Sequence, residues 1–178
     1  MMLRSPRRGG CQGSAGFSLI ELLIVVAIIL VIAAIAVPNL VRARIAANEA
    51  SAATSVRRIA TAEIAYSAAY PTVGYAPDLA SLGGPPTGCA PSSTSACMID
   101  SLLASGTKSG YQLKAAGFSA SGGPNDSFVA SSAPELFNVT GVRNFCIVTD
   151  GVLREQAGIN GGAPAADVST CMGYASAQ

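Results

Sequence analysis

The stretch that decides the fold reads Gly16-Phe-Ser-Leu-Ile-Glu-Leu-Leu-Ile-Val-Val-Ala-Ile-Ile-Leu-Val-Ile-Ala-Ala-Ile-Ala-Val-Pro38. Its length and apolar character suit a helix that crosses a bilayer about 30 Å thick. One carboxylate, Glu21, lies near its start, and a charge at such a position costs about 2.5–3.5 kcal/mol on insertion scales. The segment offers no opposite charge, so we expect the partner of Glu21 to come from another copy of the chain.

A short basic segment precedes the apolar run. Residues 1–16 contain three arginines and no acid, which holds this end of the chain in the cytoplasm. Two alternatives are a secretory signal peptide cleaved after Ala36, which would release a soluble binding domain, and a plain membrane anchor. The apolar run is longer than the core of a signal peptide, and Glu21 argues against a plain anchor.

Composition limits the classes of function. The chain has 178 residues, a formal net charge of +1 and no histidine. Its length suits one domain plus an anchor. Without histidine it lacks the commonest general base and metal ligand, so we expect no enzyme. The near-zero net charge gives no indication of direct binding to nucleic acid.

The segment Gly16-Phe17-Ser18-Leu19-Ile20-Glu21, followed by the aliphatic run and Pro38, resembles the N-terminal signature of prepilins. Prepilins are the precursors of type IV pilins and of type II secretion pseudopilins. The resemblance implies cleavage after Gly16 by a membrane-embedded prepilin peptidase and N-methylation of the new N-terminal Phe17. It also implies assembly through this helix, with Glu21 and Pro38 as assembly residues and an inner-membrane assembly platform as partner. Leu30 departs from the pattern, because pilins often carry glycine there and leucine is the better helix former.

Helical spacing continues beyond the apolar run and predicts one long helix that ends before Pro71. Pro38 should kink it, because proline removes a backbone donor. The charged residues of this part fall between the apolar positions, and we expect them on a solvated or inter-subunit face. The apolar stripe is Val41, Ile45, Ala52, Val56, Ile59, Tyr66 and Tyr70, and the charged residues are Arg42, Arg44, Glu49, Arg57 and Arg58.

Strand patterns follow a loop rich in glycine and proline, in which we expect one short helical turn near residues 98–104. Asp150-Gly151 is a pair favoured in type I′ hairpin turns. The hairpin at 143–154 resembles the terminal hairpin of one pilin-like subgroup. The predicted fold is therefore α+β and type IV pilin-like: a long kinked helix, half of it transmembrane, packed on three or four antiparallel strands. The expected strands are 111–115, 127–131, 144–149 and 152–155.

The expected organisation has five parts, which are the leader to be cleaved, the transmembrane and assembly helix, the amphipathic half of that helix, a connecting loop, and a sheet with its C-terminal loop. Their residue ranges are 1–16, 17–38, 39–70, 71–110 and 111–178.

Cysteine usage favours disulfides in an oxidising compartment. Cys11 lies in the predicted leader, which leaves Cys89, Cys97, Cys146 and Cys171. The first two bracket seven residues, and the last two would tie the tail to the sheet. The resemblance favours this sequential pairing over the two others. A zinc site is the alternative, but the spacings contain no Cys-x2-Cys pair.

Three aspartates, Asp126, Asp150 and Asp167, are calcium candidates, because hard cations bind the oxygens of loop acids. Ordinary turn formation is the alternative explanation. No spacing matches the calcium site of major pseudopilins, and we expect no cofactor.

These observations predict a structural subunit of a type IV pilus, with a type II secretion pseudopilin as the alternative. The two predicted disulfides and the loose surface loops favour the pilin, whereas the terminal hairpin and the candidate calcium acids keep the pseudopilin as the alternative. In either case we expect a single-pass inner-membrane protein with a periplasmic C-terminal domain, which polymerises with copies of itself and can reach the cell surface.

Overall fold

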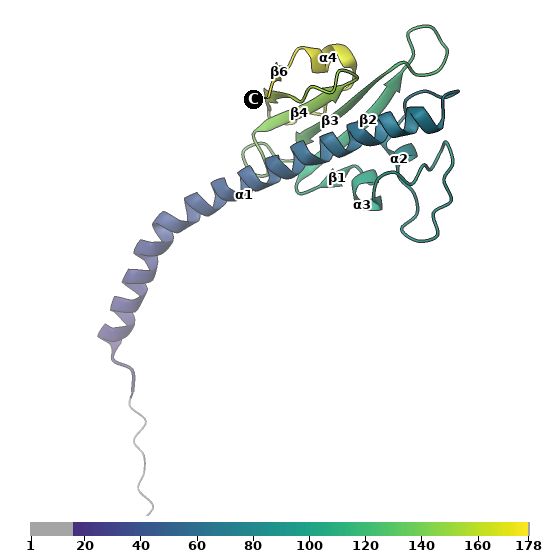
Figure 1. The fold of residues 1–178 in the computed structure, drawn as a ribbon. Coiled ribbons are helices and arrows are strands. Elements are labelled where there is room, and N and C mark those ends of the chain that lie inside the picture. The colour runs from purple at the N-terminus through teal and green to yellow at the C-terminus, as the bar shows by residue number, and fades with distance from the viewer. Residues whose placement is uncertain (1–15, 178) are drawn as a thin grey trace, which may run out of the picture. The chain divides into compact units, whose positions relative to one another are not determined.

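The computed structural model describes residues 16–177, so residues 1–15 of the predicted leader, with Cys11, lie outside it. The chain divides into two compact units, with the boundary between Asn39 and Leu40. Figure 1 shows the order of the elements along the chain. They are α1 (Leu19–Ala69), α2 (Leu79–Leu82), α3 (Ser101–Ala104), β1 (Thr107–Lys108), β2 (Tyr111–Phe118), β3 (Ser127–Pro134), β4 (Arg143–Val148), β5 (Arg154–Ala157), α4 (Val168–Met172) and β6 (Ala175–Ser176).

The first unit consists of the N-terminal part of α1 and the residues just before it. Its side chains are apolar on every face of the helix, and nearly all are exposed to solvent in the isolated chain. The helix continues through Pro38 without an interruption in its assignment. The kink expected at this proline stays a prediction.

The second unit is built on a six-stranded antiparallel sheet in which each strand pairs with the next along the chain. Its four longer strands, β2 to β5, correspond to the four that the sequence predicts. β1 and β6 are two-residue strands added at the two edges, too short to be found from alternation. The prediction of an α+β, pilin-like fold is confirmed, with a long helix packed on an antiparallel sheet.

The two central strands, β3 and β4, are buried on both faces. Successive side chains of a strand point to opposite sides, so each strand packs against two different parts of the unit. On β4, Phe145 and Ile147 pack toward the C-terminal part of α1, whereas Cys146 and Val148 pack toward the tail and α4. Figure 1 shows α1 crossing one face of the sheet, with the yellow tail beside β4. From α1 the larger cluster takes Ala52, Val56, Ile59, Ala60, Ala62 and Tyr66.

Three local expectations are wrong. Glu49 is buried instead of solvated, because its carboxylate pairs with Arg143 on β4. Val41, at the start of the predicted stripe, is exposed because the sheet does not reach it. Asp150-Gly151 does not form a type I′ turn: only Gly151 has a positive φ, of 73°, and five residues separate β4 from β5.

Two short helices lie in the connection between α1 and the sheet. The expected helical turn near residues 98–104 is present as α3, and α2 is an additional turn in the same connection. Each of these short helices starts at an aspartate whose side chain accepts a hydrogen bond from the third residue beyond it, which satisfies one free N–H at the helix start.

Candidate assembly site

The start of α1 has one of the two hydrogen bonds of a capping box. Ser18 directly precedes the first helical residue, and Glu21 lies three residues later. The Glu21 Oε2 atom accepts a hydrogen bond from the Ser18 backbone N–H at 3.0 Å. Such a contact satisfies one of the free donors at a helix start, and the negative charge suits the positive end of the helix dipole.

The other oxygen of Glu21, Oε1, accepts no hydrogen bond among residues 16–177. The carboxylate therefore has one oxygen committed to its own helix and one available to a partner from outside. We did not predict the cap, although the pattern Ser-x-x-Glu before an apolar run is its sequence signature.

Gly16 is not required by the local fold. A Cβ atom added there would meet nothing within 4 Å, and its φ does not lie in the left-handed region. Phe17, the next residue, is 78% exposed and makes no hydrogen bond within the described chain. Among residues 16–177, no contact of the fold requires glycine at position 16 or phenylalanine at position 17.

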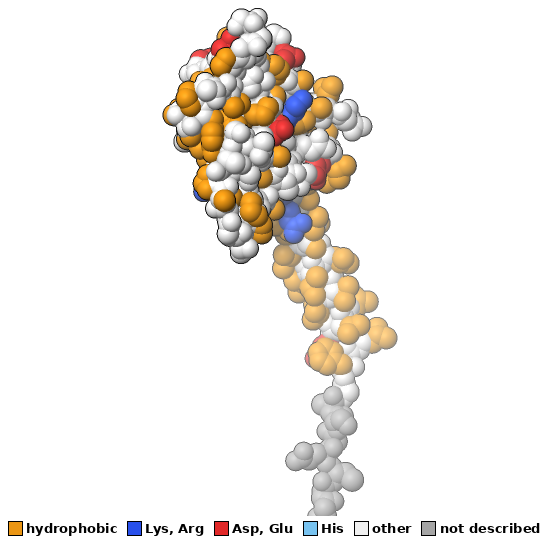
Figure 2. Space-filling view, turned by 90° about the vertical axis from the view of Figure 1, so that its right-hand side faces the viewer, with side chains coloured by type: hydrophobic (Ala, Val, Ile, Leu, Met, Phe, Trp, Pro, Cys, Tyr) orange, Lys and Arg blue, Asp and Glu red, His pale blue; other side chains and the backbone are white. Residues whose placement is uncertain are grey.

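The apolar run has the properties of a membrane span. Among the described residues, α1 is the one helix long and apolar enough to cross a bilayer, and the mean hydropathy of its most apolar 18 residues is 3.3 with none of them buried. Figure 2 shows apolar side chains over the visible face of this part of the helix. Leu30 lies within it as an ordinary exposed helical residue.

In the second unit, a buried carboxylate joins α1 to the sheet. Glu49 accepts a hydrogen bond from the Val142 backbone N–H at 2.9 Å and pairs with the Arg143 guanidinium at 2.8 Å. The same guanidinium reaches Glu155 on β5, also at 2.8 Å. The hydrogen bond that Arg143 donates to Glu49, with the negative charges beside it, raises the pKa of Arg143 above its ordinary value. This contact fixes α1 on the sheet at the N-terminal end of the unit.

A second buried acid, Glu63, lies farther along α1. Its Oε2 atom accepts a hydrogen bond from the Ala76 backbone N–H at 2.8 Å, which holds the segment that follows the helix. Oε1 is buried with no partner among the described residues. Burial raises the pKa of Glu63 to about 7; the Ala76 hydrogen bond opposes the rise and the charge of Asp78 adds to it.

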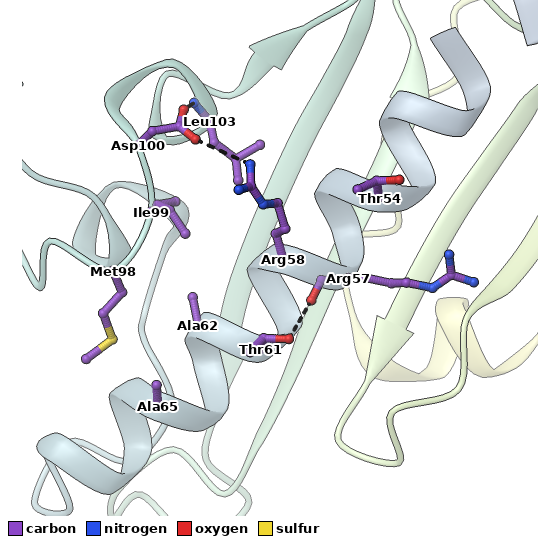
Figure 3. A pocket seen from close by; sticks show the side chains of 10 residues that line it. All are labelled: Thr54, Arg57, Arg58, Thr61, Ala62, Ala65, Met98, Ile99, Asp100 and Leu103. Atoms are coloured by element: carbon purple, nitrogen blue, oxygen red, sulfur yellow. Dashed lines mark hydrogen bonds and ion pairs between the residues drawn. The ribbon is translucent and has the colours of Figure 1, made fainter. Parts of the chain in front are cut away.

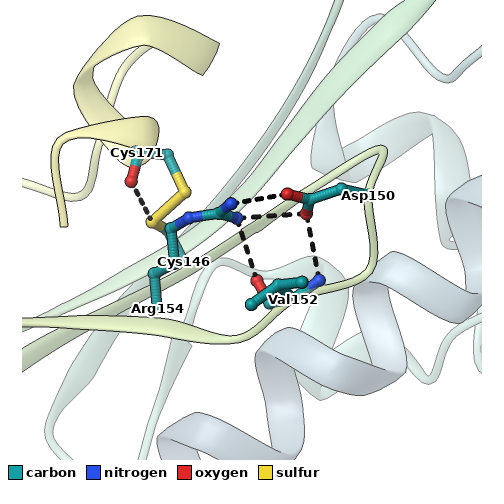
Figure 4. Close-up of polar contacts among 5 residues, drawn as sticks. All are labelled: Cys146, Asp150, Val152, Arg154 and Cys171. Carbon is teal, nitrogen blue, oxygen red and sulfur yellow. Dashed lines mark hydrogen bonds and ion pairs between the residues drawn. A yellow bond between two sulfur atoms is a disulfide. The ribbon is translucent and has the colours of Figure 1, made fainter. Parts of the chain in front are cut away.

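The two disulfides of the structure join Cys89 to Cys97 and Cys146 to Cys171, the pairs that the resemblance favours. The second connects β4 to α4 and so holds the tail against the sheet. Figure 4 shows this disulfide beside the ion pair between the Arg154 guanidinium and the Asp150 carboxylate. The hydrogen bond from Arg154 lowers the pKa of Asp150.

The three calcium candidates do not come together. Asp126 accepts a hydrogen bond from the Ala120 N–H, Asp150 pairs with Arg154, and Asp167 caps α4. Within residues 16–177 there is no group of three or more His, Cys, Asp or Glu side chains that could hold a metal ion. Each aspartate has a local structural role that explains its position.

Residues 11–37 match the family model for the prokaryotic N-terminal methylation motif. No curated protein and no solved structure matches the chain. The motif is the signature of type IV pilins and pseudopilins, and this chain carries it on a helix and fold that agree with it. Proteins with this signature are structural, and the motif implies processing by a prepilin peptidase and assembly into a filament.

Proposed function

We propose that the protein is a structural subunit of a type IV pilus and has no enzymatic activity. It is stored in the inner membrane with its second unit in the periplasm. A prepilin peptidase removes residues 1–16 and the new N-terminus is methylated. The subunit then leaves the bilayer through an assembly platform and polymerises through α1.

The observation that carries this proposal is the carboxylate of Glu21, with one free oxygen, on a helix that is otherwise apolar on every face. Cleavage after Gly16 creates an amine at Phe17. The amine of one subunit and the Glu21 carboxylate of its neighbour then pair, and the pairing offsets the cost of burying each charge alone. Leu19–Val37 exchange contact with lipid for contact with other helices.

The substitution Glu21→Gln tests this directly. The glutamine oxygen can still accept the hydrogen bond from Ser18, so the helix cap remains and only the charge is lost. We expect normal insertion and processing, with filament yield reduced to background. Glu21→Ala, which also removes the cap, should do no more damage than Glu21→Gln. Wild-type yield from Glu21→Gln would refute the charge-pairing account.

A type II secretion pseudopilin is the second candidate, and the likeness of the β4–β5 hairpin to the terminal hairpin of one pilin-like subgroup is the reason to keep it. The two functions are separated by deleting the gene and measuring two outcomes in the same strain. Loss of sheared surface filaments with normal protein secretion supports the pilus. Retained surface filaments with secreted proteins trapped in the periplasm support the pseudopilus.

A further inference from the structure

A rigid apolar projection lies between β3 and β4. Residues 135–139, which we call the β3–β4 knob, present Leu136 and Val139 to solvent, with exposed fractions of 59% and 61%. The loop is held from inside, because the Thr140 N–H donates to the Leu136 carbonyl at 2.9 Å. It is also tied to α1, where Asn48 donates to the Thr140 carbonyl at 3.0 Å.

The knob also carries a charge. Glu135, at its start, is exposed and takes part in no ion pair among the described residues. Two aliphatic side chains and one carboxylate, displayed together on a braced loop, make a surface suited to an apolar groove with a basic side.

Such a groove lies on the same unit, between α1 and residues 98–103. Its volume is about 530 Å³, within the range of about 300–1,000 Å³ usual for binding pockets. Figure 3 shows its apolar side chains and the guanidinium of Arg58, which reaches across toward Asp100. Its lining is Thr54, Arg57, Arg58, Thr61, Ala62, Ala65, Met98, Ile99, Asp100 and Leu103.

Arg58 is available to a partner. Its Nη1 atom lies 3.9 Å from Asp100 Oδ2, and the two side chains are 63% and 52% exposed. An exposed pair at that distance contributes little stability, so another carboxylate can replace Asp100. Asp100 keeps its own role, because its Oδ1 atom caps α3 through the Leu103 N–H.

We propose that the β3–β4 knob of one subunit docks in this groove of a second copy of the chain. Leu136 and Val139 enter the apolar lining, and Glu135 pairs with Arg58. The complementary charges and apolar surfaces identify the occupant as another copy. This inference rests on the proposed filament function and adds to it a contact between second units, separate from the Glu21 contact.

The positions of the two surfaces suit a filament of parallel copies. The knob is tied to α1 at Asn48 and the groove is centred near Arg58, ten residues farther along the helix, or about 15 Å. Two parallel copies displaced by this amount make the contact in one direction only. A heterologous contact between copies that rise along a common axis, as in the proposed filament, propagates from one copy to the next.

A photocrosslinker placed at Leu136 tests the contact in the full chain. Leu136→p-benzoyl-phenylalanine is expressed in cells that assemble filaments, irradiated, and analysed by mass spectrometry. We expect dimers joined between this position and a peptide containing residues 58–65 or 98–103 of the second copy. Crosslinks to another surface of a second copy, to a different protein or to lipid would overturn the proposal.

Exchanging the charges of Glu135 and Arg58 tests the contact independently. Glu135→Arg and Arg58→Glu should each lower the ratio of filament to membrane-stored subunit by about tenfold, the change that corresponds to about 1.4 kcal/mol, and the double variant should recover it. Lys114→Glu is the control, because Lys114 on β2 is exposed and does not line the groove, and its ratio should stay within about twofold of wild type. Equal protease resistance of all variants in the membrane verifies folding.

The outcomes also separate this inference from the proposed function. A double variant no better than the single ones overturns the Glu135–Arg58 pairing. Wild-type filaments that show no knob-to-groove crosslink overturn the inference while the filament function stands. Absence of any filament from the wild-type chain, with its assembly genes present, overturns both.

Discussion

The two parts of α1 use acidic residues in opposite ways. Up to Asn39 the helix is apolar on every face, and its single acid, Glu21, is exposed and accepts a hydrogen bond on only one of its oxygens among the described residues. From Leu40 onward one face is buried against the sheet, and its two acids, Glu49 and Glu63, lie inside and bond to the rest of the unit. The two acids inside the fold bond to other parts of the unit, whereas the acid left exposed on the apolar helix is the one that we propose pairs with another subunit.

The largest effect is expected from a substitution at the predicted cleavage site, just before the first part of α1. Gly16→Val should leave the precursor uncleaved and unassembled, because the local fold has room for the larger side chain and the peptidase site alone is altered. Immunoblots of membranes and sheared filaments measure both outcomes. Gly13→Val, a glycine within the leader, is the matched control and should be processed normally. Cleavage of the Gly16→Val chain at the wild-type position would contradict the assignment of the site.

The next effect concerns the sheet on which the second part of α1 packs. Replacing Cys146 and Cys171 by serine removes their disulfide and should lower the free energy of unfolding by about 3.5 kcal/mol. The reason is that this disulfide closes a loop with a sequence separation of 25. The Cys89–Cys97 disulfide has a separation of 8, and its removal should cost about 2.5 kcal/mol. Chemical unfolding of the full chain in detergent compares them, and a reversed order would contradict the role given to the tail.

A smaller loss should follow when the buried acid near the unit boundary is removed. Glu49→Ala leaves the half-buried Val142 N–H without its acceptor and Arg143 without its principal partner. We expect a loss of about 2–3 kcal/mol. Glu155→Ala removes the other carboxylate of Arg143, which is more exposed, and should cost less than about 1 kcal/mol. Equal losses in thermal unfolding would show that Glu49 is not the main tie between helix and sheet.

The smallest effect is a pH dependence from Glu63. Because burial raises its folded pKa to about 7 from an ordinary value of 4.5, the folded state binds more protons than the unfolded state between these values. Stability from this group is therefore full below pH 4.5 and is lost as pH rises toward 7. Glu63→Gln should flatten this slope in unfolding measured from pH 4 to 8, with a gain on the order of 1 kcal/mol at pH 8 after the cost of burying the amide. An unchanged slope would exclude Glu63 as its source.

The sequence predicts the first part of α1 better than the second. Gly16, Phe17, Glu21 and Pro38 form a local pattern, and the strands from β2 to β5 follow from local alternation and β-propensity. The burial of Glu49 depends on Arg143, 94 residues away, so the helical pattern alone places it on the wrong face. The same is true of the groove at Arg58, whose opposite wall comes from residues 98–103. The capping box at Ser18 is local and could have been predicted.

The central claim is that α1 starts as a processed assembly segment, and the N-terminus of the mature chain tests it most directly. Intact mass measurement and N-terminal sequencing of the protein from cells that carry its assembly genes should give a chain that begins at N-methyl-Phe17. A chain that begins after Ala36 would identify a secretory signal peptide and contradict the account. A chain that retains the leader would contradict the processing step on which assembly depends.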